Sequence, residues 1–100
     1  MKTHRVKLLT IIAPDVLEAR LAADVLRLGA KGYTVASAVG AGLSGKRDSD
    51  WEGRNIRLET LVNAQTAERI LAELSEHYFE SYGVIAFLSD VEVLRANKYE

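Results

Sequence analysis

The sequence predicts one α+β domain in which strands and helices follow one another in the order β-α-β-β-α-β. Four segments have the apolar patterns of strands, two repeat apolar residues at helical spacing, and the chain of 100 residues has the length of a single domain. We therefore expect one domain over residues 1–100, built as a four-stranded antiparallel sheet with two helices on one face.

The first part of the chain predicts a strand, a helix and a second strand. Mostly apolar, alternating residues indicate a strand over 6–12. Pro14 and Asp15 begin a helix, because proline fits the first helical turn and an acidic residue there complements the helix dipole. Gly29 ends it as a left-handed cap. The apolar stripe of this helix consists of Leu17, Leu21, Val25 and Leu28. Alternation returns over 31–39 and indicates the second strand.

The last part of the chain predicts the remaining two strands and the second helix. A strand is expected over 55–62, and Asn63 is a good N-cap for the helix that follows. The buried stripe of this helix consists of Ala67, Ile70, Leu71, Leu74 and Tyr78. The apolar run 84–88 indicates a buried strand, which residues 89–94 either extend or follow with a short edge strand. This order is that of the ferredoxin-like fold.

The strands carry apolar residues on both faces, which predicts an oligomer. Two helices can cover only one face of the sheet, and a soluble monomer rarely exposes so large an apolar surface. We expect the uncovered face to include Leu9, Ile85 and Phe87 and to be buried in a homo-oligomer. A trimer is the preferred arrangement, and the pattern also allows a dimer.

Composition argues against several functional classes. The chain has no cysteine, which excludes disulfides, thiolate zinc sites and cysteine nucleophiles and fits a cytoplasmic location. A net charge of −1 provides no general surface for nucleic acid. His4 and His77 lie far apart without an acidic cluster, so we expect no metal site and no cofactor. We also expect no signal peptide, no membrane span and no catalytic residues.

The segment 40–54 is the main candidate for a binding site. It lacks periodicity and is rich in glycine, serine and charged residues, and loops of this length are usually functional or disordered. Its small residues at 40–42 let backbone N–H groups approach an anion, and its cations are Lys46, Arg47 and Arg54. Phosphate binding is one interpretation, and glycines that only permit a turn are the simpler one. Trp51 either contacts a partner or folds back onto the domain.

Arg57 and Glu59 stand on one face of an otherwise apolar strand. They form either an ion pair across strands or subunits, or a contact with a ligand at a subunit boundary. The sequence leaves both open.

Five short segments resemble motifs of the PII signalling proteins, in the same order and over nearly the whole chain. They are residues 11–14 (IIAP here, IIKP in the family), 32–35 (GYTV, GMTV), 40–42 (GAG, GFG), 55–59 (NIRLE, KVKIE) and 89–92 (SDVE in both). The long T-loop of that family corresponds to residues 43–54.

Other features resemble the PII-like branch associated with carboxysomes and bicarbonate transporters. The turn at 81–83 is short and has no phosphate-binding lysine, the T-loop has no tyrosine, and the following strand reads VIAF. The resemblance implies a non-enzymatic homotrimer that binds ADP or AMP between subunits and responds to bicarbonate. It also implies control of inorganic carbon uptake, through contact of the T-loop with a bicarbonate transporter or a carboxysome-linked protein.

The resemblance also implies roles for individual residues. Ile11 and Thr34 would line the adenine pocket, with Glu59 near the edge of the base. The residues expected at the ribose and phosphates are Gly40, Ala41, Gly42 and Arg95. The candidates for phosphate or bicarbonate that rest on charge are Lys46, Arg47, Arg54 and Arg57.

The main alternative is a divalent-metal-binding ferredoxin-like trimer of the cation-tolerance type, which would need ligands clustered in a cleft. A small ferredoxin-like enzyme would need a buried acid–base group or an apolar cavity. An RNA-binding domain would need aromatic stacking platforms on its middle strands, which the sequence lacks.

Overall fold

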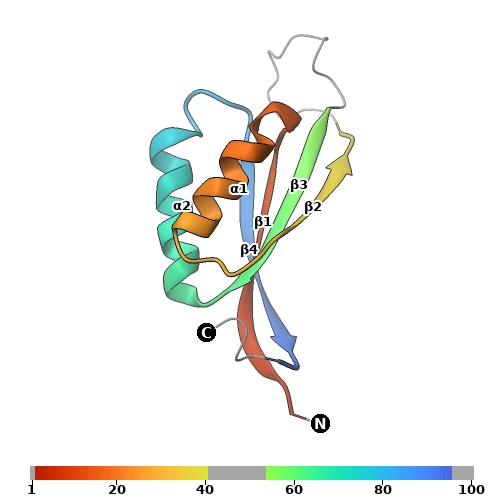
Figure 1. Cartoon of the computed structure of the whole chain (residues 1–100), viewed down its shortest axis with the longest axis vertical. Coiled ribbons are helices and arrows are strands. Elements are labelled where there is room, and N and C mark those ends of the chain that lie inside the picture. The colour runs from red at the N-terminus through yellow and green to blue at the C-terminus, as the bar shows by residue number, and fades with distance from the viewer. Residues whose placement is uncertain (1, 41–53, 96–100) are drawn as a thin grey trace.

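The computed structural model describes residues 2–40 and 54–95, which form one antiparallel sheet with helices against one face (Figure 1). In chain order the elements are β1 (His4–Pro14), the 3-10 turn η1 (Asp15–Leu17), α1 (Glu18–Arg27), β2 (Thr34–Ala38), β3 (Asn55–Val62), α2 (Ala64–His77) and β4 (Ile85–Val93). The strand order across the sheet is β2-β3-β1-β4. The predicted βαββαβ ferredoxin-like arrangement is therefore confirmed.

Three strands differ in their boundaries from the sequence-based expectation. β1 runs from His4 to Pro14 rather than over residues 6–12, so Pro14 ends a strand, and α1 begins only at Glu18 after a 3-10 turn. β2 begins at Thr34 rather than at residue 31, because the Gly32 carbonyl accepts a hydrogen bond from Thr60 Oγ1 at 2.6 Å, a side-chain bond outside the strand ladder. β4 is one strand of nine residues that pairs with β1 from Ile85 to Val93. Residues 89–93 therefore extend the fourth strand and do not form a separate edge strand.

The caps predicted for the two helices are confirmed. The Asn63 side chain accepts a hydrogen bond from the Thr66 backbone N–H at 2.8 Å at the start of α2. Gly29 after α1 has a φ of 125°, a conformation that glycine adopts without steric cost. No helix among the described residues is long and apolar enough to cross a membrane.

The hydrophobic core lies between the two helices and the face of the sheet that they cover. Leu9 and Ile11 of β1 and Leu58 of β3 are completely buried there. Both helix stripes predicted from the sequence reach this core, and Tyr78 at the end of α2 is its largest fully buried side chain.

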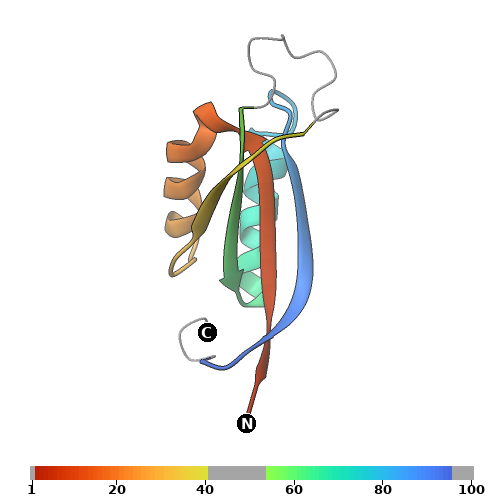
Figure 2. The same ribbon diagram turned by 90° about the vertical axis from the view of Figure 1, so that its right-hand side faces the viewer.

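The opposite face of the sheet carries no helix of the described chain. In the side view α1 lies on one side of the strands (Figure 2). Ile85 and Phe87 are 41% and 47% exposed on the uncovered face, as expected. The placement of Leu9 on that face was wrong: side chains alternate along a strand, so Leu9 points into the core and Leu8 lies on the uncovered face.

Candidate functional site

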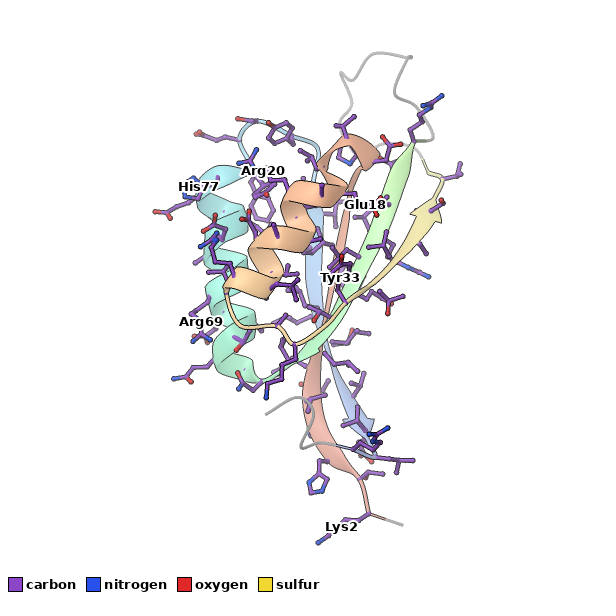
Figure 3. The ribbon with its side chains drawn as sticks, in the orientation of Figure 1. Lys2, Glu18, Arg20, Tyr33, Arg69 and His77 are labelled. Carbon is purple, nitrogen blue, oxygen red and sulfur yellow. The ribbon has the colours of Figure 1, made fainter. Side chains whose placement is uncertain are left out.

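A pocket of about 360 Å³ opens where β2 begins beside β3. Its size lies within the range of small-molecule sites. The residues that line it are Leu8, Lys31, Gly32, Tyr33, Thr34, Glu59, Thr60 and Leu61. The lining therefore combines apolar side chains from β1 and β3 with polar residues, among them Thr34 and Glu59. Figure 3 shows Tyr33 at the start of β2, well away from α2.

Strand register brings Thr34 and Glu59 together at the pocket. Thr34 pairs directly with Glu59 across β2 and β3, and Thr10 pairs with Glu59 across β1 and β3. Directly opposed residues of antiparallel strands share one face of the sheet. Thr10 is 1% exposed, and its hydroxyl donates to Glu59 Oε2 at 2.8 Å. The Glu59 carboxylate is therefore held at the wall of the pocket.

A strip of polar residues leads from the pocket toward the segment 41–53. Arg57 lies two residues before Glu59 on the same face and is exposed, and the sheet ends at the pair Ala38 and Asn55. The four steps along β2 from Thr34 to Ala38 span about 13 Å at ~3.3 Å per residue. Beyond them Gly40 is exposed, with no atom within 4 Å of the position that a Cβ would take.

The backbone of Arg54, the first described residue after the gap, is fixed by a hydrogen bond. The Arg54 carbonyl accepts a hydrogen bond from the Asp15 backbone N–H at 2.9 Å. This bond ties the start of β3 to the end of β1, so Arg54 and Gly40 lie at the same end of the sheet.

The structure brings some of the predicted site residues together and separates others. Thr34 and Glu59 line one pocket, and Arg57, Arg54 and Gly40 follow toward the end of the sheet. Ala41, Gly42, Lys46, Arg47 and Trp51 lie outside the described residues.

Ile11 and Arg95 do not join this group within one chain. Ile11 is completely buried beneath the sheet, so its side chain has no surface for a ligand, and the neighbouring Ile12 faces the uncovered side. Arg95 is exposed and follows β4, which ends beside His4 at the opposite end of the sheet from Gly40. Any contact between Arg95 and the phosphate region would therefore need another subunit.

Sequence reasoning missed Thr10, Leu8 and Leu61 as parts of the site. Thr10 stood out as a polar residue in an apolar strand, which is a usable signal. Its partner Glu59 is 49 residues away, however, so the pairing became visible only in the folded chain.

Tyr78 and Asp90, whose pKa values are shifted, do not line the pocket. Burial, and then the hydrogen bond to Asp24, raise the pKa of Tyr78. The hydrogen bond from Lys7, 2.7 Å long, lowers the pKa of Asp90. Residues 2–40 and 54–95 contain no group of three or more histidine, aspartate or glutamate side chains that could hold a metal ion.

Comparison with known proteins identifies the family. The model of the family "Nitrogen regulatory protein P-II" matches residues 6–98. The chain belongs to the P-II family. The resemblance predicted from the five sequence motifs is thereby confirmed.

Solved structures of P-II-like proteins align with the chain over nearly its whole length. A candidate PII-like signalling protein from Thermus thermophilus is 52% identical, with 100% of both chains covered and a TM-score of 0.87. CPII from Thiomonas intermedia, bound to ADP, AMP and acetate, is 27% identical over 99% of this chain and 98% of CPII, with a TM-score of 0.84. CPII bound to ADP, AMP and bicarbonate is 26% identical over 98% and 96%, with a TM-score of 0.79.

Proposed function

We propose that this P-II family protein is a non-enzymatic cytoplasmic sensor that binds ADP or AMP between the subunits of a homotrimer and responds to bicarbonate. Its output is the control of inorganic carbon uptake or concentration through the segment 43–54, whose partner is a bicarbonate transporter or a carboxysome-linked protein. The observation that carries the nucleotide site is the pocket at the start of β2, where Thr34 and Glu59 meet on the uncovered face.

The arrangement of the site supports one orientation of the nucleotide. Leu8 and Leu61 offer apolar surface to a base, and Thr34 and Glu59 offer polar atoms to its edge. Arg57 lies toward the end of the sheet, with the exposed Gly40 beyond it. The phosphates of a nucleoside diphosphate laid along β2 therefore approach a guanidinium, which favours phosphate oxygens.

The trimer is supported by two features of the single chain. The uncovered face exposes Ile85 and Phe87, which a soluble monomer does not usually leave in water. Arg95 lies at the wrong end of the sheet to reach phosphates within its own chain. Packing of the uncovered faces buries the apolar side chains, and a neighbouring subunit then supplies Arg95.

Calorimetry with ADP, AMP, ATP and cyclic AMP, each with and without bicarbonate at fixed pH and ionic strength, tests the proposal. We expect ADP and AMP to bind. Bicarbonate should raise their affinities by about 5- to 150-fold, the usual range of coupling between sites. The affinity for ATP should increase less with bicarbonate, because the third phosphate of ATP competes with bicarbonate for the same cations. Affinities of ADP and AMP that do not change with bicarbonate would contradict the response to inorganic carbon, and the absence of any binding would contradict the nucleotide site.

A matched pair of variants tests the orientation. Arg57→Gln should lower the affinity for ADP about tenfold, because a charge-assisted contact to phosphate is lost. Arg5→Gln, which removes an exposed arginine at the other end of the sheet, should leave the affinity unchanged. Equal effects of the two variants would contradict a specific contact with Arg57.

A further inference from the structure

We propose that Thr10 is a positioning residue that fixes the Glu59 carboxylate as a hydrogen-bond acceptor in the pocket, and that this acceptor selects a base carrying an exocyclic amino group. The proposal rests on the proposed nucleotide site and adds to it the reason for base selectivity. Thr10 does not line the pocket and acts through Glu59.

The burial of Thr10 makes its hydroxyl a fixed donor. The side chain lies between two directly paired neighbours, Glu59 of β3 and Phe87 of β4, and is 1% exposed. Its β-branched side chain has few rotamers in a strand. Among the residues that the structure describes, the side-chain hydrogen bond to the Glu59 carboxylate comes from this hydroxyl.

The direction of this hydrogen bond determines what Glu59 offers to a ligand. A carboxylate has two oxygens and, when ionised, only accepts hydrogen bonds. Oε2 accepts from Thr10, which leaves Oε1 as an acceptor on a carboxylate that already forms part of the pocket wall. An acceptor held in this way favours an N–H donor such as the 6-amino group of adenine. A purine without that group leaves the carboxylate unpaired.

The alternative is that Thr10 only stabilises the sheet. In that case its hydroxyl affects unfolding but does not affect the choice between two ligands that differ in one amino group. The ratio of two affinities therefore separates positioning from structural support, since a general loss of stability changes both affinities together.

The test measures the affinities of the parent protein and its variants for AMP and for purine riboside 5′-monophosphate, which lacks only the 6-amino group. The parent should bind AMP about tenfold more tightly than the analogue, the size of one hydrogen bond to a charged group. Thr10→Val, which keeps the shape but removes the donor, should reduce this ratio to about twofold. Thr10→Ser keeps a hydroxyl at the same position and should retain most of the ratio.

A second variant shows whether Thr10 acts through Glu59. Glu59→Leu should also bring the ratio to about twofold or less, and adding Thr10→Val to it should have no further effect. A ratio that stays at the parent value in Thr10→Val would overturn the proposal, even if that variant melts at a lower temperature. An effect of Thr10→Val that persists in the Glu59→Leu background would also overturn it.

The same measurements distinguish this inference from the proposed function. If the parent binds AMP but Thr10→Val leaves the ratio unchanged, the positioning role is wrong and the nucleotide site stands. If the parent binds neither ligand, the proposed function itself is wrong.

Discussion

At the scale of single residues, Tyr78 shows how this small core includes a polar group. Its ring is completely buried at the end of α2, and its hydroxyl donates to Asp24 Oδ2 of α1 at 2.6 Å. The Arg20 guanidinium lies 4.4 Å from the centre of the ring, on the side of α1 that faces α2 (Figure 3). The hydrogen bond joins the two helices, so the ring is buried without an unpaired hydroxyl, while the Asp24 side chain stays 20% exposed.

Removing this hydroxyl should destabilise the protein. Tyr78→Phe leaves one Asp24 oxygen without its donor, and we expect the free energy of unfolding to fall by about 1–2 kcal/mol. Urea unfolding measures the change. Tyr33→Phe is the matched control, because Tyr33 is exposed at the edge of the pocket. An unchanged stability of Tyr78→Phe would show that the bond between the helices contributes nothing net.

Ionisation of Tyr78 should destabilise the protein at alkaline pH. The pKa of Tyr78 is raised in the folded protein, first by burial and then by Asp24, above its ordinary value of 10.0. Its contribution is therefore complete below pH 10 and is lost as the pH rises further, because the unfolded state releases the proton first. Stability should decline more steeply above pH 10 in the parent than in Tyr78→Phe. Parallel pH profiles of the two proteins would contradict this assignment.

At the scale of elements, the turn from α1 to β2 depends on one glycine. Gly29 has a positive φ, and a Cβ built there would lie 2.9 Å from Arg69 Nη2 and 3.2 Å from Thr66 Oγ1 of α2. Arg69 in turn donates from Nε to the Leu28 carbonyl at 3.1 Å, which satisfies the end of α1. The cap of one helix is therefore built partly from a side chain of the other.

Substitution of this glycine should weaken the turn. Gly29→Ala should lower the free energy of unfolding by about 1 kcal/mol or more, because alanine is strained at this φ and crowds Arg69. Gly32→Ala is the control, since no atom lies within 4 Å of its Cβ position and its φ is not positive. Equal midpoints for the two variants in urea would contradict the role of the positive φ.

The ends of β1 and β4 form a ribbon that extends past the helices (Figure 1). One face of this ribbon carries the Lys7–Asp90 ion pair, and Thr3 donates to Glu92 at 2.7 Å nearby. The opposite face carries the directly paired Val6 and Val91. Lys7 lies on the same face of β1 as the core residues Leu9 and Ile11, so the covered face becomes charged in the ribbon, whereas Val6 and Val91 keep the uncovered face apolar.

At the scale of the whole molecule, the uncovered face is the proposed assembly surface. We expect light scattering at micromolar concentration to give the mass of a trimer. Ile85→Lys should reduce the measured mass toward that of a monomer, because a charge on the apolar face cannot be buried without a partner. Val16→Lys changes an apolar residue on the helix side that is even more exposed than Ile85 and should leave the trimer intact. A monomeric parent, or a trimeric Ile85→Lys, would contradict assembly through this face.

Assembly and ligand binding should fail together in Ile85→Lys. If nucleotide binds between subunits, this variant loses affinity for ADP although Ile85 does not line the described pocket. Undiminished binding by a monomeric variant would show that a single chain holds the complete site.

Much of the fold could be predicted from the sequence because the signals are local. Apolar periodicity identified the strands and helices, and Asn63 and Gly29 identified a helix start and a helix end. These features depend on residues within a few positions of one another, which is the range that a pattern can detect. The start of β2 was missed because a side chain from β3, Thr60, bonds to the Gly32 carbonyl.

The sequence by itself determined the βαββαβ order and the apolar excess on both sheet faces, and its resemblance to the family proposed Thr34 and Glu59 as site residues. Only the tertiary structure decided which residues share a face and a pocket. Register pairs Thr34 and Thr10 with Glu59, while strand alternation turns Ile11 into the core and the antiparallel course of β4 carries Arg95 to the far end. Register is a property of paired strands that lie far apart in sequence, and a one-residue shift would reverse every side chain.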